Sequence, residues 1–380
     1  GESGGATQTL MLTAVQPKLA AAAPVCMISA HFQGGCVCEH APSLRTETYN
    51  VEIAALAAPR PLLVVSTGGD WTNETPDVEL PDLKRLYALY GAADRVEGFH
   101  QEAPHNYNAA SRRAVYAWLR RVLTAQGDDG ALLVEPDLTA ETVASWRCDP
   151  ALLPADRLEG DALLHHLKGI VRALPPSGPA EARLRLAHLT GVWSLSRPTV
   201  AAHPQRRMLV VHPADRDAEA QTFAAKLHAA GAECALLALE PGEEAEGMLT
   251  DGFVDSAAAR LVQAVLREAD QLGAAAVVGI GAAGPICALA APFLAGVAAL
   301  ACELDDFAPD DENAYLDRLY VPGLLRAGGL GAALSAALPA TYVFGSGAAP
   351  LPPNVERGDP AAAVKWLQAR LQARNDGPAA

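Results

Sequence analysis

The chain has 380 residues, half of them hydrophobic, which is long enough for two domains with sizeable cores. Acidic residues outnumber basic ones by 44 to 29, a formal net charge of −15, so nucleic acids and anionic membranes are disfavoured as partners because they would repel the chain. Small neutral molecules fit this charge better, and nothing in the sequence defines an oligomeric state.

The chain opens on GESGG, a Gly-x-Ser-x-Gly pattern formed by Gly1, Ser3 and Gly5. In the nucleophile elbow that this pattern describes, a strand turns sharply into a helix and exposes the serine hydroxyl at the tip. The serine backbone is strained there, and the glycines avoid collisions with the strand and the helix. A plain glycine-rich loop would have the same composition, so the pattern predicts a nucleophile only if partners follow.

Apolar or β-branched runs predict strands at residues 19–28, 61–67 and 95–101. Helical periodicity predicts helices at residues 82–91 and 111–123 between and after them. Strands that alternate with helices indicate an α/β fold with a parallel sheet. In such sheets the chemistry lies in the loops at the carboxyl ends of the strands.

Two of these loops carry the side chains that a serine nucleophile needs. Asp70 follows the second predicted strand, and His105 follows the third. An imidazole can remove the serine proton, and a carboxylate can hold that imidazole in the right tautomer and stabilise its charged form. Either residue alone could be a turn or cap residue. The order Ser, Asp, His at three strand ends predicts a catalytic triad of Ser3, Asp70 and His105.

Residues 1–124 resemble the carboxyl-terminal half of an α/β-hydrolase catalytic domain of the dienelactone-hydrolase and acetylxylan-esterase type. The segments that carry the resemblance are GESGG, CMISAHFQGGCVCE, VEIAALAAPRPLLVVSTGGDWT and YGAADRVEGFHQEAPHNYN. The resemblance implies hydrolysis of an ester, with carbohydrate deacetylation as the expected case, through an acyl-enzyme on Ser3. It also favours a secreted or periplasmic location, and it implies a fragment cut at its own active site, because the family's amino-terminal strands are missing.

In the family, one of the missing loops donates a backbone N–H to the oxyanion hole, which leaves the Gly4 N–H as the donor that can be named. Loss of one donor lowers turnover by about 10²- to 10³-fold. The chain as given is therefore expected to hydrolyse small acetyl esters poorly or not at all, whereas a parent restored upstream would do so readily. Two alternatives stay open: a serine peptidase of the prolyl-oligopeptidase kind, which shares the elbow and the triad order, and a non-catalytic binding module.

The loop after the first predicted strand holds four side chains that could bind zinc, namely His31, Cys36, Cys38 and His40. The Cys-x-Cys-x-His spacing is tighter than that of structural zinc sites, which use Cys-x2-4-Cys pairs supported by a second, distant pair. We therefore expect no metal and no cofactor, and a loop that shapes the substrate site. Whether Cys36 and Cys38 are free, disulfide-bonded or metal-bound is left open.

Residues 125–200 are predicted to be a linker with helical segments, and residues 201–380 a second α/β domain with strands at 208–213, 233–240 and 274–278. The uncharged stretch at residues 273–302 is long enough to cross a bilayer, but its prolines, glycines and alanine-rich composition disfavour a membrane helix.

A Gly-x-Gly-x-x-Gly fingerprint, Gly279, Gly281 and Gly284, follows the third of these strands, with Glu303 about twenty residues on, as in dinucleotide-binding sites. That fingerprint normally lies on the first βα turn of its domain, and Pro285 disturbs the helix after it. Both departures favour a tight strand-to-helix turn over a cofactor site.

A repeat gives a better account of the second half. When the chain is shifted by 278 positions against itself, about sixty residues align without a gap, so that Ser3 falls on Gly281 and Asp70 falls on Ala348. No histidine follows Ala348. Residues 201–380 are therefore predicted to be a degenerate α/β-hydrolase-like domain that lacks nucleophile, acid and base.

Overall fold

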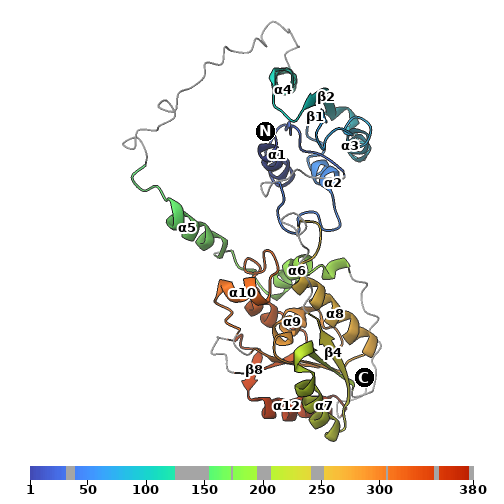
Figure 1. Ribbon diagram of the computed structural model, residues 1–380, viewed down its shortest axis with the longest axis vertical. Helices are drawn as coiled ribbons and strands as arrows, with labels where there is room; N and C mark the ends of the chain where they lie inside the picture. Colours follow the sequence, from blue (N-terminus) through green and yellow to red (C-terminus); the bar gives the residue numbers. More distant parts are fainter. Residues whose placement is uncertain are drawn as a thin grey trace. The chain divides into compact units, whose positions relative to one another are not determined.

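The structure is a computed structural model of the chain. It describes residues 1–30, 39–124, 154–172, 174–194, 207–240, 252–304, 307–345 and 351–375 (Figure 1). The chain divides into two compact units. Unit 1 comprises Gly1–Arg157 with Gly247–Val254, and unit 2 comprises Leu158–Glu246 with Asp255–Ala380.

Among its described residues, unit 1 contains two parallel strands, both close to where the sequence predicts them, and four α-helices. The strands are β1 (Leu62–Gly69) and β2 (Val96–Pro104), and the helices are α1 (Gly4–Val15), α2 (Asn50–Ala55), α3 (Glu79–Ala88) and α4 (Ala109–Thr124), with a short 3-10 helix at Ala93–Arg95. Alternate side chains of β1 enter different cores: Leu62 and Val64 pack with α1, α2 and α3, whereas Leu63 and Val65 pack with α4. Helices thus cover both faces, as expected for a parallel sheet.

The predicted strand at 19–28 is not a continuous strand. Ala22 and Val25 form isolated parallel bridges to β1, and Val25 forms another to Glu2. Pro24 has no N–H, whereas the N–H groups two residues before and after it both donate to carbonyls at or beside β1. The missing donor interrupts the ladder of hydrogen bonds. The segment at residues 22–25, called the bridged segment below, still lies between Glu2 and β1, so the parallel order is Glu2, bridged segment, β1, β2.

Unit 2 is an α/β unit with a six-stranded parallel sheet in the order β4-β3-β5-β6-β7-β8. The strands are β3 (Arg207–Pro213), β4 (Glu233–Leu239), β5 (Ala276–Gly279), β6 (Ala299–Glu303), β7 (Ala340–Phe344) and β8 (Val355–Gly358). Its α-helices are α5 (Gly160–Arg172), α6 (Pro179–Leu189), α7 (Asp217–Ala229), α8 (Ala257–Leu272), α9 (Ala283–Ala290), α10 (Glu312–Arg318), α11 (Gly329–Ser335) and α12 (Pro360–Asn375), with 3-10 turns at Val192–Ser194, Ala214–Arg216 and Ala291–Phe293.

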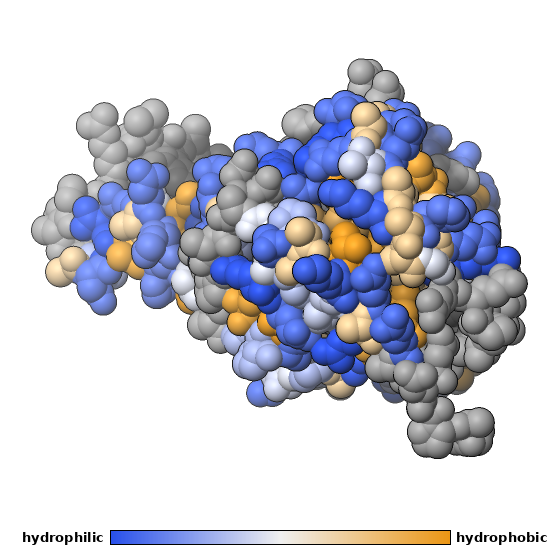
Figure 2. All heavy atoms as spheres, turned by 90° about the horizontal axis from the view of Figure 1, so that it is seen from below, coloured by the Kyte–Doolittle hydropathy of each residue, from blue (hydrophilic) through white to orange (hydrophobic). Residues whose placement is uncertain are grey.

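Both faces of the unit 2 sheet are buried. Leu209 and Val211 of β3 pack with α8, α9 and α11, whereas Met208 and Val210 pack with α7 and α12 on the other face. Burial of each such side chain contributes roughly 1.5–3 kcal/mol. On the face drawn in Figure 2, hydrophilic residues cover most of the surface, and hydrophobic ones form small patches among them.

The predicted domain boundaries at residues 124 and 200 stay a prediction. Within the predicted linker, the part from Leu158 onward belongs to unit 2, where the fully buried Leu186 of α6 joins the core. Conversely, Gly247–Val254 groups with unit 1.

The uncharged stretch at 273–302 folds as β5, α9, a 3-10 turn and most of β6, and nearly all of it is buried. The prolines and glycines of this stretch lie at helix starts and in or beside turns. One continuous helix would be broken at these residues. Within the described ranges, no helix combines the length and the apolar composition that a membrane span requires.

The two units share a run of elements at the offset found in the sequence. Shifted by 278 positions, α1 falls on α9, the bridged segment falls on β6, and the start of β1 falls on β7. The strand order β5-β6-β7-β8 matches the order Glu2, bridged segment, β1, β2. The turn residues also match, because Ser3 has φ 51° and Gly281 has φ 57°.

Candidate active site

Ser3 lies at the turn between the bridged residue Glu2 and helix α1. Its φ of 51° and ψ of −124° are rare for a residue with a side chain, and such backbone strain costs about 1–3 kcal/mol. The backbone holds it there, because the Ser3 N–H donates to Val25 O at 3.1 Å. A Cβ on Gly1 would lie 2.3 Å from Gly5 O, whereas a Cβ on Gly5 would meet nothing within 4 Å. The expectation that these glycines avoid steric collisions is therefore correct for Gly1 and wrong for Gly5.

Asp70 and His105 follow β1 and β2 directly, and the pairing of these strands brings the two side chains together. His105 Nδ1 lies 2.7 Å from Asp70 Oδ2. The other carboxylate oxygen, Oδ1, accepts from Thr72 N at 2.7 Å and from Thr72 Oγ1 at 2.5 Å. Burial raises the pKa of Asp70, but hydrogen bonds from Thr72, His105 and Thr67 outweigh burial and lower that pKa below its usual value. The carboxylate therefore stays ionised and fixes the imidazole.

The opposite edge of the imidazole faces a second carboxylate. His105 Nε2 lies 3.0 Å from Glu2 Oε1, while Ser3 Oγ donates to Glu39 Oε1 at 3.1 Å. Among the described residues, no hydrogen bond joins Ser3 Oγ to His105. The structure thus brings Asp70 and His105 together but turns the serine hydroxyl to a different partner. Catalytic hydrogen bonds often form only once substrate is bound.

Sequence reasoning missed three residues of this site: Glu2, Glu39 and Cys26. Glu2 occupies the first variable position of GESGG and reaches His105 because it precedes the turn. Glu39 is almost fully buried, and within the part of the chain that the structure describes its Oε2 has no hydrogen-bond partner. Neither contact has a signal in the sequence, since both depend on how the loops lie against the elbow.

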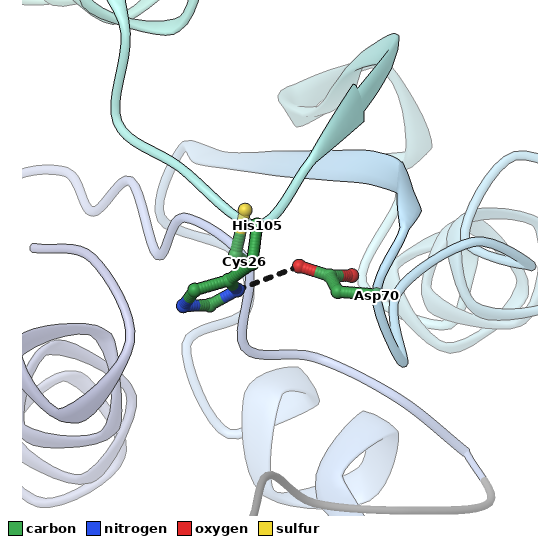
Figure 3. Close-up of side chains that lie close together, drawn as sticks. All are labelled: Cys26, Asp70 and His105. Atoms are coloured by element: carbon green, nitrogen blue, oxygen red, sulfur yellow. Dashed lines mark hydrogen bonds and ion pairs between the residues drawn. The ribbon is translucent and has the colours of Figure 1, made fainter.

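Cys26 is fully buried and has a positive φ of 52°. Its Sγ lies 3.5 Å from Asn106 O and 3.8 Å from Thr67 Oγ1. Burial raises the pKa of the Cys26 thiol to about 11, so the thiol is protonated at neutral pH. Figure 3 shows Cys26 beside the Asp70–His105 pair.

Gly4 is the first residue of α1. The first N–H groups of a helix have no intrahelical partner, and they stabilise a negative charge placed near the helix start. The Gly4 N–H therefore suits the oxyanion role that the sequence assigns to it, as a proposal.

The four side chains that could bind zinc, which are expected from the sequence to hold no metal, cannot be compared as a set, because His31, Cys36 and Cys38 lie outside the described residues. His40 is buried, and its ring centroid lies 5.9 Å from that of Phe253. Gly252 O also accepts from Arg45 N at 2.7 Å. Gly252 and Phe253 therefore contact Arg45 and His40 within unit 1.

In unit 2 the turn that corresponds to Ser3 is filled by other side chains. The Gly281 N–H donates to Glu303 Oε2 at 2.6 Å, and Arg216 Nη1 lies 3.5 Å from the same oxygen. A Cβ on Gly284 would lie 1.7 Å from Glu303 O, so this glycine allows α9 to pack against β6. A bound dinucleotide places its pyrophosphate on the N–H groups of such a turn. Here the Glu303 carboxylate accepts the Gly281 N–H instead. Ala348 lies outside the described residues.

We expect unit 2 to have no chemistry of its own. In a Ser3→Ala background, Gly281→Ser should create no ester hydrolysis, because the position that matches Asp70 is Ala348 and no histidine follows it to act as the base. NAD and NADP should give no heat in calorimetric titrations of the full chain. A micromolar affinity that Gly281→Val abolished would show instead that the fingerprint binds a dinucleotide.

No protein-family model and no curated protein matches this chain. Two solved structures are similar to part of it. Methylesterase BT1017 is 44% identical, covers 33% of this chain and 29% of its own length, and has a TM-score of 0.32. A carbohydrate esterase family 15 glucuronoyl esterase from Caldicellulosiruptor kristjansonii is 15% identical, covers 37% of this chain and 46% of its own length, and has a TM-score of 0.28. The chain thus spans less than half the length of either structure, and both are named as esterases.

Proposed function

We propose that unit 1 carries the catalytic triad of a serine ester hydrolase, with Ser3 as nucleophile, His105 as general base and Asp70 as the carboxylate that orients it. One observation carries the proposal. The Asp70–His105 pair lies at the carboxyl ends of two adjacent parallel strands, in the same small unit as a serine held at positive φ on a strand-to-helix turn. This combination is typical of the α/β-hydrolase site.

The reaction follows from these groups. Ser3 Oγ leaves Glu39, loses its proton to His105 Nε2 and attacks the ester carbonyl, while the Gly4 N–H stabilises the developing oxyanion. Asp70 holds Nδ1 protonated and stabilises the imidazolium. The alcohol leaves with the proton from Nε2, and water then hydrolyses the acyl-enzyme by the same route. Nε2 must be released from Glu2 before it can accept the serine proton.

A non-catalytic binding module is the second candidate. Two observations favour it, namely the Ser3–Glu39 hydrogen bond and the Glu2–His105 ion pair, because each occupies an atom that catalysis requires. A peptidase of the prolyl-oligopeptidase kind is the third, since it shares the elbow and the triad order.

A substrate panel separates the three candidates. The full chain is expected to hydrolyse acetylated sugars slowly but with saturation, and to leave a prolyl anilide intact. Methyl esters of uronic acids belong in the panel as well, because an acetyl ester and a methyl ester both present an ester carbonyl to Ser3. Cleavage of the anilide alone would favour the peptidase. Saturable sugar binding without turnover of any ester would favour the binding module.

A further inference from the structure

Cys26, Asp70 and His105 form a cluster that the proposed hydrolysis does not fully use. Each offers one metal-ligating atom, and the three atoms lie within 4.8 Å of one another. The residues come from three separate loops, and Figure 3 shows the Cys26 sulfur beside the imidazole and the carboxylate. The thiol has no part in the proposed reaction.

The surroundings of the cluster resemble the support that metal ligands have in known sites. Metal-binding histidines commonly donate the other ring N–H to a carboxylate, and ligating carboxylates are themselves hydrogen-bonded. Here His105 Nε2 faces Glu2 Oε1 at 3.0 Å, and Thr72 donates twice to Asp70 Oδ1. The His105 side chain is 31% exposed, which gives an ion a way in.

We propose that Cys26, Asp70 and His105 bind a zinc ion that switches the hydrolase site off, an inference about regulation that rests on the proposed function. One sulfur, one nitrogen and one oxygen suit zinc, and three protein ligands leave a fourth tetrahedral position for water. At the usual zinc–ligand lengths, nitrogen and oxygen ligands lie roughly 3.3 Å apart. His105 and Asp70, now 2.7 Å apart, must therefore separate slightly.

The chemistry of binding explains the inhibition. The Cys26 thiol loses its proton to solvent when its sulfur binds the ion. His105 donates the Nδ1 lone pair to zinc, so the ring proton must lie on Nε2, where Glu2 accepts it. A protonated Nε2 cannot take the proton of Ser3, and Asp70 no longer orients the ring. Zinc thus removes base and orienting carboxylate together.

Cobalt titration of the full chain tests the site without any need for activity. Co²⁺ is expected to give a thiolate-to-cobalt charge-transfer band in the near ultraviolet, with zinc displacing it. Cys26→Ser should remove the band, whereas the double variant Cys36→Ser, Cys38→Ser should keep it. Cys234→Ser, which changes a half-buried free thiol in unit 2, is the matched control and should keep it too.

Two further variants guard against misfolding of Cys26→Ser. Glu2→Gln should weaken cobalt affinity by about 10- to 100-fold, because it removes the group that holds the metal-binding ring. Asp70→Asn should weaken it as well. A band that survived Cys26→Ser, or that vanished in the Cys36, Cys38 double variant, would overturn the proposal.

The functional consequence has its own test. Zinc should block covalent labelling of Ser3 by a fluorophosphonate in the unmodified chain but not in Cys26→Ser. Labelling without a cobalt band would sink the metal site and leave the hydrolase standing. A cobalt band with no labelling in zinc-free protein would support the metal site and count against the hydrolase. Labelling that zinc left unchanged, despite a bound metal, would refute the inhibitory role.

Discussion

Replacing Ser3 by alanine is expected to lower the rate of acetyl-ester hydrolysis by about 10⁴- to 10⁶-fold, because no other group in the proposed mechanism can form the acyl-enzyme. Alanine has the same backbone restrictions as serine, so the strained turn at φ 51° changes little. Initial rates of the purified full chain against an acetylated sugar measure the effect.

Ser43→Ala is the matched control for this variant. Ser43 is another serine of unit 1 with positive φ, at 58°, and it has no assigned role. The rate of Ser43→Ala should stay within a factor of about two of the unmodified chain, because Ser43 takes no part in the proposed mechanism. Equal losses in the two variants would show that the loss in Ser3→Ala does not report a nucleophile.

Asp70→Asn is expected to lower the rate by about 10⁴-fold with little change in structure, because an amide favours the wrong imidazole tautomer and cannot stabilise the imidazolium. The buried position of Asp70 and its two hydrogen bonds from Thr72 keep the side chain in place. Rates and the near-ultraviolet circular dichroism of the variant, measured together, separate lost chemistry from lost folding.

Glu2→Gln provides the comparison, since Glu2 contacts the other nitrogen of the same ring. Removing that charge frees Nε2 to face Ser3, so the rate should be retained or raised. If Glu2→Gln lost the activity and Asp70→Asn kept it, Glu2 would be the orienting carboxylate and the assignment of Asp70 would be wrong.

Asp70 also links stability to pH. Its pKa is lowered in the folded chain from an ordinary 3.8, so its ionised form stabilises the fold above that value. This contribution is lost as the pH falls through the lowered pKa. The difference in unfolding free energy between the unmodified chain and Asp70→Asn should therefore be largest near neutrality and should shrink below pH 3.8.

The positions of Asp70 and His105 could be predicted because apolar runs and helical periodicity mark the strands that precede them. The strand predicted at residues 19–28 from its apolar residues was wrong, because Pro24 has no N–H to donate and the ladder is interrupted there. The steric role predicted for Gly5 was also wrong, because that residue has open space around it.

The contacts that decide whether Ser3 is ready to react were beyond prediction. Glu2 and Glu39 reach His105 and Ser3 through side-chain rotamers and loop positions, which leave no periodic pattern in a sequence. In unit 2 the sequence offset did predict the turn at Gly281. The role of Glu303 became visible only in three dimensions, where it accepts the Gly281 N–H.

The most direct test of the account is the site of a covalent fluorophosphonate adduct, mapped by peptide mass spectrometry on the zinc-free full chain. An adduct is expected on the peptide that contains Ser3, and it should be lost in Ser3→Ala and after heat denaturation. An adduct on a different serine, or a native chain that stays unlabelled at high probe concentration, would contradict the claim that Ser3 is the nucleophile.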